Sequence, residues 1–139
     1  MAKNNRIEED MLEFDDDVKC YNGVPFTGIG FEKYPNGNLK SETPYEDGFQ
    51  SGTSREWYST GQTMCELEWK KGARFSKRKC WYQNGVVKSV SNYEWGIELN
   101  YKEYNEKGEL VTDRELDPNS PDSQYAVLLK FRQVYGEQE

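Results

Sequence analysis

The sequence predicts an all-β protein, an antiparallel meander of β-hairpin repeats followed by one short C-terminal helix. Two observations lead to this fold class. Glycines recur every 24 residues at Gly37, Gly61 and Gly85. Aromatic residues keep the same interval in two columns, which are Tyr34, Tyr58 and Tyr82, and Tyr45, Trp69 and Tyr93. A fixed period of this length is typical of stacked units that bury apolar surface against their neighbours, so the chain is an internal repeat.

Each repeat contains two turn signals, and these set the expected number of strands. Residue pairs that end in glycine follow one another every 11 to 14 residues, at Asn22-Gly23, Asn36-Gly37, Asp47-Gly48, Thr60-Gly61, Lys71-Gly72, Asn84-Gly85, Trp95-Gly96 and Lys107-Gly108. Asn-Gly and Asp-Gly tolerate the positive φ angles of tight hairpins, and the stretches between them are rich in Tyr, Trp, Val and Thr. The pattern predicts about eight short strands between residues 20 and 113.

Charge divides the chain into three parts. Residues 1–19 hold seven acids and three bases, residues 20–105 hold ten acids and eleven bases, and residues 106–139 hold eight acids and four bases. We expect an acidic N-terminal arm over 1–19, a hairpin domain over 20–113, and a polar loop with a helix over 114–139. An acidic block is usually a solvated tail or a short amphipathic lead-in. The alternative is an arm that docks on a basic partner, with contacts through Asp15, Asp16 and Asp17.

The C-terminal stretch carries the signals of a helix over residues 121–135. Ser120 is a suitable N-cap, Pro121 fits the first helical position, and Asp122 lies where the helix dipole favours an anion. Gly136 is a suitable stop, and the residues between follow helical spacing, namely Tyr125, Leu128, Leu129, Phe131, Arg132 and Tyr135. We expect this helix to cover the open end or one face of the sheet, because repeat arrays need a cap with a polar outer face.

The composition argues against an enzyme, a metal centre and a cofactor. The chain has no histidine, which removes the commonest general base and the usual nucleophile triads. It has neither a C-x-x-C pair nor a glycine-rich nucleotide motif. No apolar run approaches the ~18 residues of a membrane span, and the N-terminus lacks the apolar core of a secretory signal. The scattered Cys20, Cys65 and Cys80 fit reduced thiols in the cytoplasm.

Strand alternation separates a packed face from a possible binding face. If the Asn36-Gly37, Thr60-Gly61 and Asn84-Gly85 pairs form two-residue turns, Tyr58 lies opposite Thr63 and shares a packed face with residues such as Leu67 and Trp69. The other face then carries aromatic and apolar residues among mixed charges, namely Trp57, Met64, Trp81, Arg55, Glu66, Lys79 and Lys88. Such a face is either a protein interface or the surface that packs under one of the termini. A register error of one residue would exchange the two faces.

A basic segment spans residues 70–79, in which six of ten residues are Lys or Arg. With Trp69, Phe75 and Trp81 interleaved, this pattern occurs in proteins that bind nucleic acid or anionic lipid. The chain as a whole has a net charge of −7, so we expect no direct contact with nucleic acid. We expect the segment to pair with acids of a protein partner or of the chain's own termini.

Two repeat units resemble the MORN-type repeat variant. They are residues 34–48, YPNGNLKSETPYEDG, and residues 57–72, WYSTGQTMCELEWKKG. The opening segment over residues 21–28, YNGVPFTG, is similar to that of bacterial YwqK-family antitoxins. The resemblance covers about residues 21–113 and weakens after Asn100.

The resemblance implies a hairpin-repeat fold and an antitoxin or immunity role without an active site. It implies a cognate protein toxin as partner, and a nuclease or a deaminase is one possibility for that toxin. MORN-type repeats also serve as scaffolds that bind other proteins or anionic membranes, and this is the alternative function.

Overall fold

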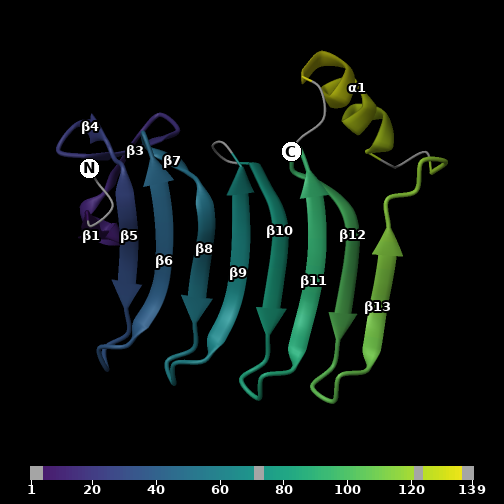
Figure 1. Ribbon diagram of the computed structural model, residues 1–139, viewed down its shortest axis with the longest axis horizontal. Helices are drawn as coiled ribbons and strands as arrows, with labels where there is room; N and C mark the ends of the chain where they lie inside the picture. Colours follow the sequence, from purple (N-terminus) through teal and green to yellow (C-terminus); the bar gives the residue numbers. More distant parts are fainter. Residues whose placement is uncertain (1–4, 71–73, 121–123, 136–139) are drawn as a thin grey trace.

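The computed structural model describes residues 5–70, 74–120 and 124–135. Its main feature is a meander of eight consecutive antiparallel strands (Figure 1), in agreement with the predicted fold class. They are β5 (Gly28–Lys33), β6 (Leu39–Glu46), β8 (Gly52–Trp57), β9 (Thr63–Lys70), β10 (Arg74–Trp81), β11 (Val87–Glu94), β12 (Ile97–Tyr104) and β13 (Leu110–Glu115).

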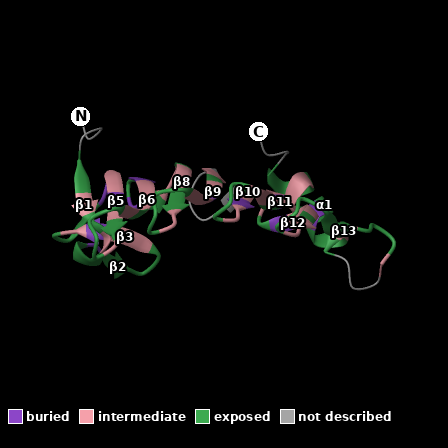
Figure 2. Ribbon diagram, turned by 90° about the horizontal axis from the view of Figure 1, so that it is seen from below, coloured by how far each residue is buried: buried purple, intermediate pink, exposed green. Residues whose placement is uncertain are grey.

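The sheet is a single layer when it is viewed edge-on (Figure 2). Its described strands therefore bury few side chains completely, among them Tyr45, Cys65, Cys80 and Ser91. Cross-strand neighbours, rather than one continuous interior, hold such a sheet together. The larger apolar clusters lie at its two ends.

The N-terminal end carries a small cap built by the acidic segment and the residues that follow it. Strand β1 (Arg6–Glu8) pairs in parallel with β5, and the 3-10 turn η1 (Glu9–Met11) comes next. Strands β2 (Glu13–Asp15), β3 (Val18–Tyr21) and β4 (Val24–Pro25) form a second sheet, while β7 (Phe49–Gln50) extends β6. Leu12, Phe26 and Tyr45 form the buried cluster of the cap. The acidic segment is thus an amphipathic lead-in that packs on the sheet, not a solvated tail.

The C-terminal end carries the predicted helix, α1 (Tyr125–Tyr135). Arg132 forms an ion pair with Glu94 at 2.6 Å, and the ring of Trp95 lies 5.9 Å from Phe131 and 5.3 Å from Tyr135. These contacts place α1 over the β11–β12 turn (Figure 1). The predicted start at Pro121 and Asp122 and the stop at Gly136 lie outside the described residues.

The turns are of two kinds, and this corrects the assumption of two-residue turns at Asn36-Gly37, Thr60-Gly61 and Asn84-Gly85. Between β8 and β9, the Tyr58 N–H donates to the Gln62 carbonyl and the Gly61 N–H donates to the Tyr58 carbonyl, both at 2.9 Å. The same two bonds recur over residues 34–38, 82–86 and 105–109. This is the three-residue hairpin loop that ends in a left-handed residue, and Gly61 has φ of 102°. Trp57, not Tyr58, therefore lies opposite Thr63.

Two-residue turns occur at the other ends of the strands. Asp47 and Gly48 have φ of 51° and 88°, and Trp95 and Gly96 have φ of 55° and 77°. Two successive positive φ angles are those of the type I′ hairpin turn. The Lys71-Gly72 turn signal lies outside the described residues.

The tyrosine column explains the 24-residue period. The Tyr34 hydroxyl donates to the Trp57 carbonyl at 2.6 Å, Tyr58 donates to the Trp81 carbonyl at 2.7 Å, and Tyr82 donates to the Tyr104 carbonyl at 2.8 Å. Each three-residue loop thus bonds to the next hairpin along the sheet.

The fourth loop differs, because Asn105 takes the place of the tyrosine. Its side-chain oxygen accepts hydrogen bonds from the backbone N–H groups of Lys107 and Glu109 at 2.9 and 3.0 Å. This side chain bonds within its own loop, and β13 is the last strand in the described sheet.

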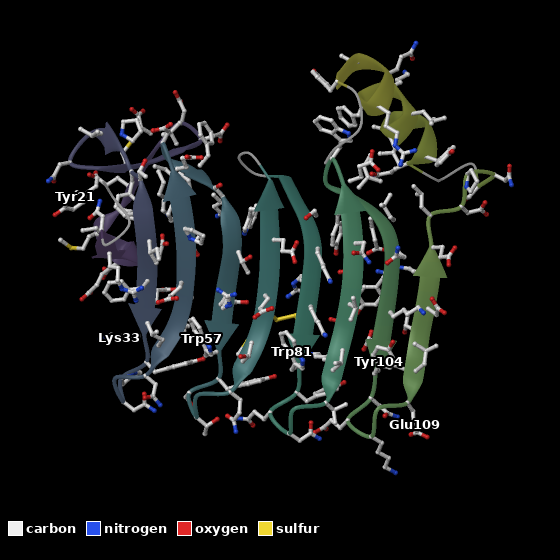
Figure 3. All side chains as sticks on the ribbon, viewed as in Figure 1. Tyr21, Lys33, Trp57, Trp81, Tyr104 and Glu109 are labelled. Carbon is white, nitrogen blue, oxygen red and sulfur yellow. A yellow bond between two sulfur atoms is a disulfide. The ribbon has the colours of Figure 1, made fainter. Side chains whose placement is uncertain are left out.

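The cysteine prediction was wrong for two of the three residues. Cys65 on β9 and Cys80 on β10 are directly opposite each other, with Cα atoms 4.0 Å apart, and they form a disulfide (Figure 3). Cys20 is free and buried. The two half-cystines look scattered in the sequence because they are 15 residues apart, but the hairpin register makes them neighbours.

Candidate protein-binding face

Register divides the side chains of the sheet into two faces. The open face carries a cross-strand row of mostly charged residues, which are Glu42, Arg55, Glu66, Lys79, Val90, Lys102 and Asp113. The capped face carries Tyr45, Leu67 and Trp69, and the N-terminal cap packs on it through Tyr45. Figure 2 shows that β2 and β3 of the cap lie on one side of the sheet, whereas β1 lies at its edge.

The seven residues predicted for partner binding all lie on the open face. Arg55, Glu66 and Lys79 are in the charged row itself. The others are two residues away from a member of that row on the same strand, and side chains two apart in a strand share a face. These others are Trp57, Met64, Trp81 and Lys88. The turn correction leaves this grouping intact. Met64 on β9 and Lys88 on β11 lie at β-bulges opposite Trp57 and Trp81, where strict alternation is interrupted.

Three aromatic residues of the open face lie beside three of the four three-residue loops, and Lys33 takes the corresponding position in the β5–β6 hairpin. Figure 3 shows Trp57, Trp81 and Tyr104 at successive loop ends of β8, β10 and β12. The carbonyl of each accepts the tyrosine hydroxyl of the preceding loop, so the backbone at these positions is fixed. Both tryptophans are only half-buried. Met64 lies at the β9 bulge opposite Trp57.

Internal ion pairs already neutralise much of the charged row. Arg6 of the cap pairs with Glu42 at 2.6 Å, and Arg55 pairs with Glu66 at 3.1 Å. The Lys79 ammonium lies 5.3 Å from the ring centroid of Trp81. Lys88 is similarly placed 5.7 Å from the Tyr82 ring. The two ion pairs and the Lys79–Trp81 contact therefore position charged groups of the row beside the two tryptophans.

Three further residues of the open face were not predicted from the sequence. Lys102 and Asp113 continue the charged row toward β13, and Tyr104 follows Trp57 and Trp81 at the loop ends. A signal for Tyr104 was present, because Trp57, Trp81 and Tyr104 each precede the first residue of a loop. The interval of 23 rather than 24 residues between Trp81 and Tyr104 hid it.

The three predicted acidic contacts lie elsewhere. Asp15 ends β2, Asp16 has φ of 56° in the following turn, and Asp17 precedes β3. All three are exposed on the cap. The structure does not bring them together with Trp57 and Trp81, because the cap lies on the opposite side of the sheet (Figure 2).

The basic segment is not one patch where its side chains are described. Alternation places Lys77 and Lys79 on the open face and Arg78 on the capped face. The side chains of residues 70–75 lie outside the described part. Within the described residues, no group of three or more His, Cys, Asp or Glu side chains is arranged to hold a metal ion. The described part of the chain also holds no helix long and apolar enough to span a membrane.

Comparison with known proteins supports the repeat. A family model described as "MORN repeat variant" matches residues 26–47 and 77–94, the segments of the β5–β6 and β10–β11 hairpins. Immunity protein YwqK of Bacillus subtilis (strain 168) is 34% identical over 129 residues, which cover 93% of this chain and 80% of that protein. The crystal structure of accessory secretory protein 1,2 and 3 in Streptococcus pneumoniae has a TM-score of 0.40 at 16% identity, over 90% of this chain and 26% of that chain.

The hairpins, their loop signature, the match to the repeat model and the similarity to Immunity protein YwqK define a MORN-repeat protein. The chain belongs to the family of Immunity protein YwqK.

Proposed function

We propose that this protein is an antitoxin that neutralises a cognate bacterial toxin domain by covering it, one molecule to one. The observation that carries the proposal is the gathering of Trp57, Met64 and Trp81 on an uncovered face of a protein related to an immunity protein. Binding without turnover fits a chain that has no histidine to act as a general base.

The two tryptophans act as the anchors of the interface. Each ring is half-buried and held on a backbone that a tyrosine hydroxyl fixes, so little conformational entropy is lost on binding. Tryptophan is among the residues that carry most of the energy of an interface when a partner buries them fully.

The charged row selects the partner and its orientation. Arg55, Glu66, Lys79 and Lys88 surround the anchors with charges of both signs. Charges of this kind change association rate and specificity more than they change affinity.

The acidic cap lies on the other side of the sheet from the two tryptophans and is a separate contact surface for a toxin that acts on nucleic acid. A nuclease or deaminase has a basic substrate groove, and Asp15, Asp16 and Asp17 then occupy the places of phosphates. Inhibition of such a toxin weakens as salt is added, because both charge sets are exposed.

The test uses the toxin that is encoded beside this protein. Calorimetric titration of the purified pair should give one molecule of each. Trp57→Ala and Trp81→Ala should each weaken binding by about 2 kcal/mol or more, and Lys88→Ala by about 1 kcal/mol or less. Trp95→Ala is the matched control, since it removes a tryptophan from the β11–β12 turn, at the other ends of the strands from Trp57 and Trp81. Deletion of residues 1–17 tests the cap separately.

Two results would contradict the proposal. The first is that the chain binds no neighbouring toxin but binds anionic vesicles or other proteins, as a MORN scaffold does. The second is that one molecule inactivates many toxin molecules, which indicates catalysis.

A further inference from the structure

A groove of about 380 Å³ crosses the capped face beside the N-terminal cap, and the proposed function does not use it. Its floor is formed by β5, β6, β8 and β9, and its wall by Glu9, Lys19 and Gln50 of the cap region. Register places its floor residues in three parallel rows, which are Glu32, Ser41 and Glu56, then Thr43, Ser54 and Leu67, then Tyr45 and Trp69.

The groove carries negative charge that the protein does not neutralise. Glu32 accepts a hydrogen bond from Ser41 at 3.0 Å, and Glu56 has no partner among the described residues. Glu32 and Glu56 stand on either side of β6, with their Cα atoms about 10 Å apart at two strand spacings.

The cations at the groove are already engaged. Lys19 pairs with Glu9 at 3.2 Å, and Arg55 pairs with Glu66 on the open face at 3.1 Å. Glu9 also accepts the Tyr45 hydroxyl at 3.0 Å. At the wall, the amide oxygen of Gln50 is buried with no hydrogen-bond partner in the described structure. The free carboxylate and amide oxygens around the groove are therefore acceptors, and the Thr43 and Ser54 hydroxyls can accept as well as donate, so a ligand that only donates hydrogen bonds matches them.

The floor offers apolar and aromatic surface next to these acceptors. The Trp69 indole N–H donates to the Ser54 hydroxyl at 2.9 Å, which holds the ring in place beside Leu67. Aromatic faces attract cations, and aliphatic side chains pack against the stem of a long basic residue.

We propose that this groove binds one arginine side chain of a partner protein. The guanidinium lies between Glu32 and Glu56, and the methylene stem packs on Leu67 and Trp69. Arginine fits better than lysine because its planar head has five donors and no acceptor, and it reaches two carboxylates at once. The site does not depend on the proposed toxin or on the open face.

The test needs no natural partner. N-acetyl-arginine amide is titrated into the full chain while the indole and methyl NMR signals of Trp69 and Leu67 are followed. We expect saturable shifts at these residues, and none with the neutral isostere N-acetyl-citrulline amide. The double variant Glu32→Gln/Glu56→Gln should bind roughly tenfold more weakly. The matched control is Glu68→Gln/Glu115→Gln, which removes two exposed carboxylates from the open face and should bind like the wild type.

Three results would overturn the proposal, and the first two need only the wild-type protein. They are the absence of saturable shifts, equal binding of the citrulline compound, and unchanged affinity in Glu32→Gln/Glu56→Gln. None of these results bears on the open face, so failure here and failure of toxin binding are distinguishable.

Discussion

The two ends of the sheet are closed in different ways. At the N-terminal end, backbone pairing and apolar packing act together, because β1 covers the edge of β5 while Leu12 and Phe26 bury the ring of Tyr45. At the C-terminal end, α1 reaches the sheet through side chains at one turn, and the edge of β13 has no neighbouring strand in the described residues.

This difference indicates which parts of a single-layer sheet contribute most to its stability. The middle hairpins are coupled to their neighbours through strand pairing, the tyrosine bonds and the Cys65–Cys80 disulfide. The N-terminal cap adds a buried cluster to this array, so we expect its loss to affect the whole sheet. Loss of the α1 contacts should remain local.

The largest effect is expected from Phe26→Ala in the N-terminal cap. Phe26 is 3% exposed and its ring lies 5.9 Å from that of Tyr45. Removing a buried ring should lower the free energy of unfolding by about 3–5 kcal/mol, measured by urea denaturation. Phe14→Ala is the control in the same cap, because Phe14 is 68% exposed, and its loss should cost about 1 kcal/mol or less. Equal losses would remove the case for a stabilising cap.

Leu128→Ala should release the helix without unfolding the sheet. Leu128 is 1% exposed, and its truncation should cost about 2–4 kcal/mol of docking energy. Hydrogen exchange should accelerate in residues 125–135, while the urea midpoint changes less than in Phe26→Ala. Leu129→Ala on the same helix removes a side chain that is 45% exposed and should leave exchange nearly unchanged. Global unfolding of the Leu128 variant would show that the two ends are equivalent.

Gly85→Val and Gly61→Val test two neighbouring three-residue loops, which lie between the N-terminal cap and α1. Both glycines have positive φ, at 89° and 102°, and a β-branched residue is strained there. We expect a loss of about 1–3 kcal/mol in thermal or urea unfolding. Gln83→Val in the same loop is the control, since Gln83 is exposed and its φ is not positive. An unchanged melting temperature in both glycine variants would contradict the loop assignment.

The smallest effect concerns the N-terminal cap at alkaline pH. Burial, and then the carboxylate of Glu9, raise the pKa of Tyr45 above its ordinary value. The folded state therefore keeps a proton that the unfolded chain releases, so stability should fall as pH rises above about 10. The free energy of unfolding, measured across this range, should fall less steeply in Tyr45→Phe. An identical slope in the variant would exclude Tyr45 as the cause.

Much of the fold followed from local patterns. The 24-residue interval predicted the hairpins, and alternation within strands grouped Trp57, Met64 and Trp81 because side chains two apart in a strand share a face wherever that strand is placed. The exact loop type did not follow, since a glycine that ends a two-residue turn and one that ends a three-residue loop look alike in sequence.

The features of the candidate sites also fall into two groups, those that the sequence determined and those that only the tertiary structure revealed. The sequence by itself determined the repeat, the number of strands in the meander and the residues that share the open face, because each depends on neighbours a few positions apart. Only the tertiary structure decided the Cys65–Cys80 disulfide, the packing of Glu9 against Tyr45, and the groove between Glu32 and Glu56. These features join residues that are 15 to 36 positions apart in the chain. Strand register and the path of the N-terminal cap bring these residues into contact, and no local sequence pattern encodes either of them.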